Sequence, residues 1–309
     1  MPSRIAGRRG FTLVEILISL VIGLIVIGAA MTFAVNTVRS VEATGLREGV
    51  TRNARFIAMS LERDFTATGV GIESTIAYGS VRVRGDTLLV LSVPFDSVMS
   101  PPYDLIPPPA ATNPLPAGGT CGATCLDLMK AADSTFDLQV GDIGRLQVGG
   151  ERRLLRVESM TSNDTAVRLV FTPLPGIFLH PASLSGGLLL NPFNTYVQKL
   201  EPVAYWVESG NLMRATRVEG SGSFKGEVIA DGIQSWEVSL IFQDGDELDN
   251  ADPTDGDPSN DYDDILSVRI RAVVAANRVD RHVNAGTLFT RSYDWRFTPR
   301  NLMYERNRR

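Results

Sequence analysis

The chain has 309 residues, 44% of them hydrophobic and 21% charged, and its formal net charge is -5. This composition is that of a folded protein with a core and excludes a disordered chain, while the length allows one large domain or two small ones. The positive residues are scattered and form no basic and aromatic stripe, so direct nucleic-acid binding is not expected. With two histidines and two cysteines, the chain is poor in groups for acid–base, nucleophilic or metal chemistry, and we do not expect an enzyme.

A basic flank precedes a long apolar run at the N-terminus. Residues 1–10 contain Arg4, Arg8 and Arg9 and no acidic residue, and residues 11–35 are apolar apart from a few polar side chains. A helix of about 20 apolar residues crosses the hydrocarbon core of a bilayer. Residues 11–35 therefore predict a transmembrane segment, and the positive-inside rule places its start in the cytoplasm and the rest of the chain outside.

Two features distinguish this segment from an ordinary secretory signal. The small residue Gly10 stands before the apolar run instead of after it, so cleavage there keeps the membrane segment. Glu15 is the only charged residue within 11–35, and a buried carboxylate costs about 2.5–3.5 kcal/mol at the centre of a membrane helix and less near its end. A glutamate at this place needs a use, unless the segment is a plain signal anchor whose Glu15 reaches the interface.

The sequence at this point resembles the cleavage and methylation motif of type IV prepilins, through the consecutive residues Gly10, Phe11, Thr12, Leu13, Val14 and Glu15. The resemblance implies that a prepilin peptidase cuts between Gly10 and Phe11, which makes residues 1–10 a leader peptide, and methylates the new amino group of Phe11. Glu15 then neutralises the Phe11 amine of a neighbouring subunit, so that two costly charges become one pair.

One long helix is expected over residues 11–65. Beyond residue 35, hydrophobic side chains recur at helical spacing among Arg and Glu residues. They are Val38, Val41, Leu46, Val50, Phe56, Ile57, Leu61 and Phe65. We expect the first half of this helix in the membrane and the second half against a globular head, and Gly23 and Gly28 permit close approach between helices.

Residues 66–309 are expected to form a sheet-rich head. Turn signals at 84–86, 149–150 and 210–211 separate short alternating runs and predict antiparallel hairpins. We interpret Arg84-Gly85-Asp86 as turn chemistry and not as an adhesion motif. The expected strands lie within 80–93, 145–148, 152–158, 203–208, 212–218, 228–230, 235–242, 265–275 and 287–297. The fold class is α+β and pilin-like, and the order of strands around an acidic loop resembles W-type minor pilins and J-type pseudopilins.

A proline-rich stretch and the two cysteines follow the first hairpin. Residues 94–118 contain eight prolines, which exclude a central strand and predict a surface loop. Cys121 and Cys125 come directly after it, and a disulfide between them is expected outside the cytoplasm, with free thiols as the alternative. A disulfide that closes so short a loop stabilises the folded state by about 2 kcal/mol in the chain-entropy model. Two cysteines offer too few ligands for a metal site.

An acidic loop is expected over residues 244–264. Its carboxylates repel one another unless they are solvated or bridged, and calcium takes about six to eight oxygen ligands on such loops. Some pilins and pseudopilins, which the chain resembles, carry calcium in a comparable loop. The ligands predicted here are Asp244, Asp246, Asp249, Asp255 and Asp257. Because Asp255 stands where an EF-hand has glutamate, the site is not an EF-hand, and a solvated loop with Asx-turns is the alternative. No other cofactor is expected.

The resemblance implies a function in assembly. The chain is expected to be a minor pilin, a structural or priming subunit of a type IV pilus that serves adhesion, twitching motility or DNA uptake. It would cross the inner (cytoplasmic) membrane once with its head outside, and an assembly platform in that membrane would add it to a fibre of other pilins or pseudopilins. The alternatives are a pseudopilin of a type II secretion system and, from another class, a signal-anchored extracytoplasmic binding protein or enzyme with an uncut leader.

Overall fold

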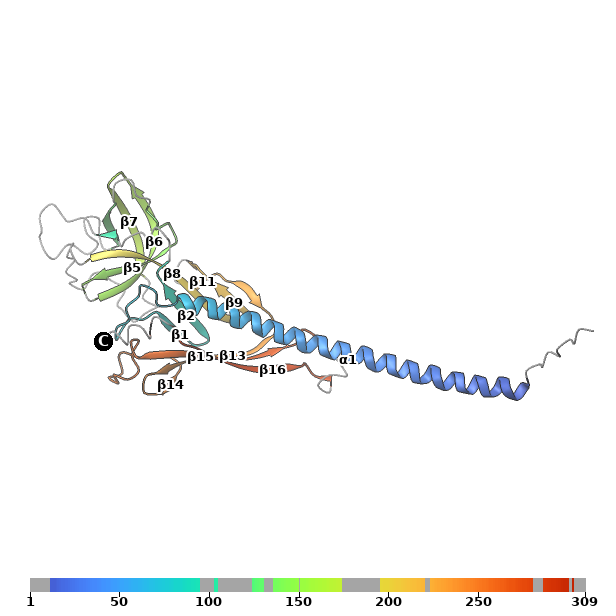
Figure 1. The fold of residues 1–309 in the computed structure, drawn as a ribbon. Helices are drawn as coiled ribbons and strands as arrows, with labels where there is room; N and C mark the ends of the chain where they lie inside the picture. Colours follow the sequence, from blue (N-terminus) through green and yellow to red (C-terminus); the bar gives the residue numbers. More distant parts are fainter. Residues whose placement is uncertain are drawn as a thin grey trace, which may run out of the picture. The chain divides into compact units, whose positions relative to one another are not determined.

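A computed structural model describes residues 12–94, 103–104, 124–130, 136–149, 151–173, 195–219, 223–279, 286–299 and 302 (Figure 1). The chain divides into two compact units, Met1–Thr51 with Ala276–Phe289 and Arg52–Ala275 with Thr290–Arg309. Helix α1, Leu13–Ala67, runs through both. One long N-terminal helix and antiparallel sheets confirm the predicted α+β, pilin-like class.

The first unit combines the N-terminal part of α1 with a short segment near the C-terminus of the chain. The guanidinium of Arg47 lies 5.8 Å from the centre of the Phe289 ring, a cation–π distance. The backbone N–H of Ala276 donates to the carbonyl of Phe289 over 2.8 Å. These contacts join the two ends of the 276–289 segment to each other and to α1.

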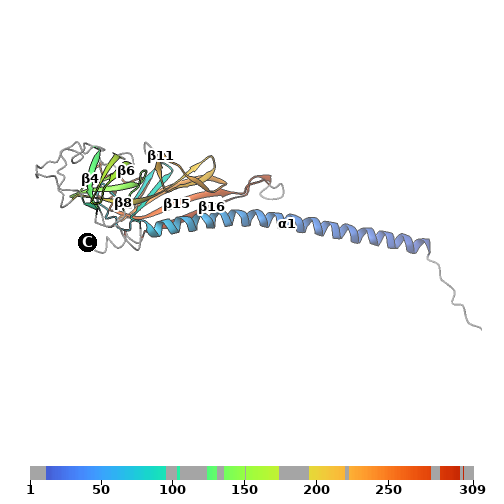
Figure 2. The same ribbon diagram turned by 90° about the horizontal axis from the view of Figure 1, so that it is seen from above.

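In the second unit, one stripe of α1 is buried because its apolar residues recur every three or four positions. Ala54, Ile57, Leu61 and Phe65 are at most 3% exposed. The Phe65 ring stacks on Phe297 of strand β16 (Thr290–Phe297), with centroids 4.8 Å apart, and Figure 2 shows this part of α1 alongside β15 (Ile265–Ala275) and β16. The stripe therefore holds the helix on the sheets.

The helix ends where a glycine takes a left-handed conformation. Gly69 has φ +78°, which favours glycine at a helix C-terminus. The N–H of Thr68 donates to the carbonyl of Asp64, and the N–H of Val70 donates to that of Ala67, so the last carbonyls of α1 find partners. The helix extends two residues beyond the predicted end at residue 65.

A ten-stranded antiparallel sheet forms most of the head, and strand β8 joins its two halves. The C-terminal half of β8 pairs with β2 and β9, and the N-terminal half pairs with β3 and β5. Pro202, which has no N–H, lies where the partner changes from β5 to β2. The strands are β1 (Val81–Arg84), β2 (Thr87–Ser92), β3 (Tyr103–Asp104), β4 (Cys125–Met129), β5 (Ile143–Val148), β6 (Glu151–Ser162), β7 (Ala166–Pro173), β8 (Thr195–Glu208), β9 (Asn211–Ala215) and β12 (Glu227–Ala230).

The part of this sheet that lies in sequence between β2 and the C-terminal half of β8 curls around a hydrophobic core of its own. Strands β3 to β7 and the start of β8 all contribute buried side chains to one cluster, and β3 contacts β4 at the far edge of the β8-β5-β6-β7-β4 order. The cluster consists of Tyr103, Leu126, Leu128, Leu138, Leu146, Val148, Leu155, Val157, Leu169, Phe171 and Val197. This part of the chain is an inserted, barrel-like subdomain with its own hydrophobic core.

A separate four-stranded sheet has the order β14-β13-β15-β16. Its strands are β13 (Ile233–Phe242), β14 (Glu247–Leu248), β15 and β16, and the sheet is joined to β1–β2 by the indole N–H of Trp236, which donates to the Asp86 carbonyl over 3.1 Å. A two-stranded pair, β10 (Val218–Glu219) and β11 (Ser223–Phe224), completes the strands of the described residues.

Several predictions on the head are confirmed and two are corrected. The three hairpins form at the expected turns, with Gly85, Gly149 and Gly210 at positive φ. In the stretch predicted as a surface loop (94–118), Tyr103 instead forms part of β3 and is 7% exposed, because its ring contacts Phe136 in the barrel-like core; the prolines lie outside the described residues, apart from Pro94. The acidic stretch 244–264 is not all loop, because it contains β14.

Candidate functional site

The described chain begins with a capping box at the start of α1. The backbone N–H and the hydroxyl of Thr12 each donate to Oε2 of Glu15 over 3.0 Å, and the N–H of Glu15 donates to the Thr12 hydroxyl oxygen over 3.3 Å. The first turn of the helix is thereby closed by its own side chains. This role of Glu15 was not predicted from the sequence, although Thr-x-x-Glu is the spacing of a capping box. Gly10 and Phe11 lie outside the described residues, and cleavage between them stays a prediction.

The apolar part of α1 is not covered by any of the described residues. The helix contains the one described candidate for a membrane span, and none of its most apolar 18-residue window is buried. Leu13, Ile25 and Phe33 are between 65% and 76% exposed. A Cβ built on Gly23 or Gly28 meets nothing within 4 Å, so close approach of a second helix is open at both glycines. These exposed apolar side chains are consistent with membrane anchoring.

A buried ion pair fixes the other end of α1 to the sheet. Asp64 accepts hydrogen bonds from Nε of Arg214 on β9 at 2.8 Å, from Nη2 of Arg214 at 3.1 Å and from the hydroxyl of Tyr205 on β8. The side chains of Asp64 and Arg214 are 7% and 15% exposed. Burial raises the pKa of Asp64, but the hydrogen bonds from Arg214, Tyr205 and exposed Arg63 outweigh it and hold the pKa below its usual value.

A cleft of about 410 Å³ adjoins this ion pair. Four of the charged residues that line the cleft already form ion pairs with one another. Lys199 bonds Asp142 over 2.8 Å, and Arg214 bonds Asp64. The described residues that line the cleft include no histidine and no cysteine. Its described lining therefore offers no imidazole and no thiol.

Cys125 opens strand β4, is 6% exposed and is not a free thiol. Its predicted partner Cys121 lies outside the described residues. The Cys121–Cys125 pairing therefore stays a prediction. If it forms, it ties the end of the proline-rich stretch to the barrel-like core.

The acidic stretch does not gather the five predicted calcium ligands. Several of them close Asx-turns, as Asp244 accepts from the N–H of Asp246 and Asp255 accepts from that of Asp257. The carboxylates that approach one another within 4.8 Å belong instead to Asp261, Asp263 and Asp264. Asp261 is 6% exposed. Burial raises its pKa, and so do the charges of Asp263, Asp264, Asp255 and Asp257.

Calcium binding by Asp244, Asp246, Asp249, Asp255 and Asp257 stays a prediction. An ion that binds only the folded state raises its thermal unfolding midpoint. We expect calcium, compared with chelator, to raise the midpoint of the full chain in detergent, and Asp255→Asn to remove most of this shift. Magnesium serves as the control because it dehydrates reluctantly. A midpoint that is the same in calcium and chelator would show that the stretch is a solvated acidic surface.

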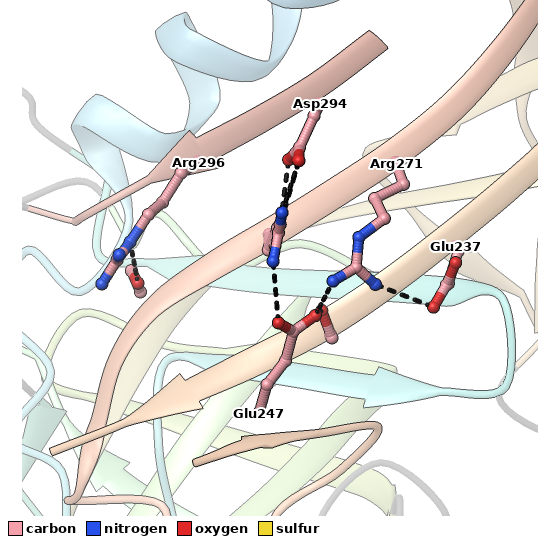
Figure 3. A network of polar contacts seen from close by, with 8 residues as sticks. Glu237, Glu247, Arg271, Asp294 and Arg296 are labelled. Atoms are coloured by element: carbon pink, nitrogen blue, oxygen red, sulfur yellow. Dashed lines mark hydrogen bonds and ion pairs between the residues drawn. The ribbon is translucent and has the colours of Figure 1, made fainter. Parts of the chain in front are cut away.

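A charged network crosses the outer face of the four-stranded sheet (Figure 3). Arg269 on β15 bonds Asp294 on β16 and Glu247 on β14, while Arg271 bonds Glu247 and Glu237 on β13. The Ser239 hydroxyl, followed by Arg269 and Arg271, holds the pKa of Glu247 below its usual value against the effect of burial. Cross-strand ion pairs of this kind hold the strands in register. The sequence showed no sign of the network, because its members come from four strands.

The comparison with family models matches residues 5–31 to the prokaryotic N-terminal methylation motif. This stretch contains Gly10, Phe11 and Glu15, and together with the long apolar helix and the antiparallel head it defines a pilin-like protein. The N-terminus is that of the type IV prepilin-like family, in which both pilins and pseudopilins are found. The comparisons with curated proteins and with solved structures gave no match.

Proposed function

We propose that this chain is a minor pilin, a structural or priming subunit that is cleaved between Gly10 and Phe11 and enters a type IV pilus through α1. The observation that carries the proposal is the position of Glu15. An exposed apolar helix follows the Gly10-Phe11 pair, and Glu15 is the single carboxylate at its start. In a fibre, the Phe11 amine of one subunit and Glu15 of the next neutralise each other in an apolar environment.

Membrane insertion precedes assembly in this proposal. The cationic leader stays in the cytoplasm, the apolar part of α1 crosses the inner membrane and the head lies outside. The prepilin peptidase and an assembly platform in the same membrane are the partners before the fibre forms, and other pilins are the partners within it. In the fibre the α1 helices cover each other's apolar faces, and Gly23 and Gly28 permit close approach.

The barrel-like subdomain supports a specialised subunit over a bulk fibre protein. Residues between β2 and β8 form a core of their own, which packing of α1 into a fibre does not require. A pseudopilin of a type II secretion system remains the second candidate, since it has the same N-terminal motif. A signal-anchored binding protein or enzyme is the candidate from another class and predicts an intact leader.

Mass spectrometry of the native protein tests the proposal. We expect the N-terminal peptide to begin at methylated Phe11, in sheared surface fibres as well as in washed membranes. A processed peptide that is found in membranes and is absent from sheared fibres favours the pseudopilin. If only chains with residues 1–10 attached are found, assembly is excluded and the anchored protein takes its place.

A further inference from the structure

The cleft beside the Asp64–Arg214 ion pair opens where strand β8 lacks a partner on one side. Pairing of β8 with β5 ends at Leu200, and pairing with β9 begins at Ala204. The three residues between them, 201–203, pair with β2 alone among the described strands. All three line the cleft. We call residues 201–203 the open edge, because this stretch of strand has backbone on one side that no neighbouring strand covers.

A proline occupies the middle of the open edge. Both backbone groups of Leu91 on β2 bond residues outside β8, so the residues on either side of Leu91 direct their backbone groups at β8 instead. Their partners Glu201 and Val203 point back at β2, and Pro202 between them directs its carbonyl to the uncovered side. Pro202 has no N–H that could be left unpaired there. The open edge therefore presents one carbonyl acceptor, which no hydrogen bond of the described residues reaches.

Two charged side chains and one hydroxyl at the cleft are also available to a ligand. Glu201 and Arg217 line the cleft and are exposed, and neither side chain has an ion pair or a hydrogen bond within the described part of the chain. Ser92 lines the cleft as well and is only 7% exposed. Its hydroxyl has no hydrogen-bond partner among the described residues, which is uncommon for a buried polar side chain.

These free groups define the chemistry of a matching ligand. The other charged residues of the cleft already form two ion pairs with one another, so a ligand meets one free carboxylate and one free guanidinium. A simple anion leaves Glu201 without a counter-charge, and a simple cation leaves Arg217 without one. A ligand with an amino group at one end and a carboxylate at the other satisfies both.

We propose that this cleft binds a short peptide with free ends. The amino end donates to Glu201 and to the Pro202 carbonyl, and the carboxylate end accepts from Arg217 and from the Ser92 hydroxyl. A peptide, unlike a single amino acid, also lays its main chain along the open edge. The cleft volume of about 410 Å³ lies within the range of about 300–1,000 Å³ that is usual for ligand pockets. The proposal goes beyond assembly, because it gives the head of this subunit a ligand.

Isothermal titration of the full chain in detergent with triglycine tests the proposal. We expect saturable binding of one peptide per chain. N-acetyl-triglycine amide has the same main chain without the two end charges, and it should bind at least about tenfold more weakly, because hydrogen bonds between charged groups are the stronger ones. No saturable binding of triglycine, or equal affinity for the two peptides, would overturn the proposal.

Substitutions at the cleft assign the two ends. Arg217→Ala and Glu201→Gln should each weaken triglycine binding about tenfold and leave the weak binding of the capped peptide as it is. Arg84→Ala and Glu208→Gln are the matched controls, because both residues are exposed and lie outside the cleft. The thermal unfolding midpoint of each variant shows that the head is folded. An equal loss of affinity in the control variants, or no loss in the cleft variants, would contradict the assignment.

Photo-cross-linking locates the peptide independently of affinity. The full chain is irradiated with a glycine tripeptide whose central residue is the diazirine amino acid photoleucine, and labelled fragments are identified by mass spectrometry. We expect the label within residues 199–203 or 214–217, and excess triglycine should suppress it. A label confined to other segments, or one that triglycine does not suppress, would overturn the placement of the site.

Discussion

Replacing Glu15 by leucine is expected to leave the chain in the membrane and remove it from the fibre. Leucine lowers the cost of inserting α1, since a carboxylate costs about 2.5–3.5 kcal/mol at the centre of a membrane helix and a smaller amount near its end. Without Glu15, however, the Phe11 amine of the neighbouring subunit is buried without a counter-charge. Quantitative immunoblots of sheared fibres and membranes measure the effect, for which we expect at least about a tenfold loss from fibres, equal to about 1.4 kcal/mol.

Glu42→Leu is the matched control, because Glu42 is an exposed glutamate of the same helix beyond the apolar run. It should enter fibres as the wild type does. Glu15→Gln keeps the length of the side chain and removes its charge. It therefore separates the effect of the charge on assembly from the effect of the side chain's shape. Normal incorporation of Glu15→Leu would exclude charge pairing as the basis of assembly.

Asp64→Ala is expected to destabilise the head by about 3–5 kcal/mol, the usual effect of removing one partner of a buried ion pair. The substitution leaves Arg214, which is 15% exposed, without its carboxylate and leaves the Tyr205 hydroxyl without its acceptor on Asp64. Urea unfolding of the full chain in detergent, followed by the fluorescence of its three tryptophans, measures the loss.

Asp127→Ala provides the comparison, because Asp127 pairs with Arg168, whose side chain is 53% exposed. Such surface pairs contribute about 0–1 kcal/mol. Equal losses for the two variants would show that the Asp64 pair does not anchor α1.

The same ion pair sets a pH dependence. Because the pKa of Asp64 is lower in the folded state than the usual value of about 3.9, its contribution is fully present above that value and is lost as the pH falls through the folded pKa. The stability difference between wild type and Asp64→Ala should therefore be constant near neutral pH and shrink below about pH 4. A difference that does not change on acidification would contradict the ionised pair.

Features that depend on neighbouring residues could be predicted from the sequence. The apolar run and the Gly10-Phe11 motif identified the class of protein, and the spacing of Ile57, Leu61 and Phe65 predicted the buried face of α1. Turn residues placed three hairpins, and the run 265–275 coincides with β15. Each of these signals is local, because helix periodicity, strand alternation and turn geometry depend on residues a few positions apart.

Only the tertiary structure determined what joins distant segments. Asp64 and Arg214 are 150 positions apart, and nothing near either residue marks it as a partner of the other. Tyr103 enters the barrel-like core from a proline-rich stretch because β8 offers it an edge. Pairing across long stretches of chain depends on burial and register, which a local pattern does not encode.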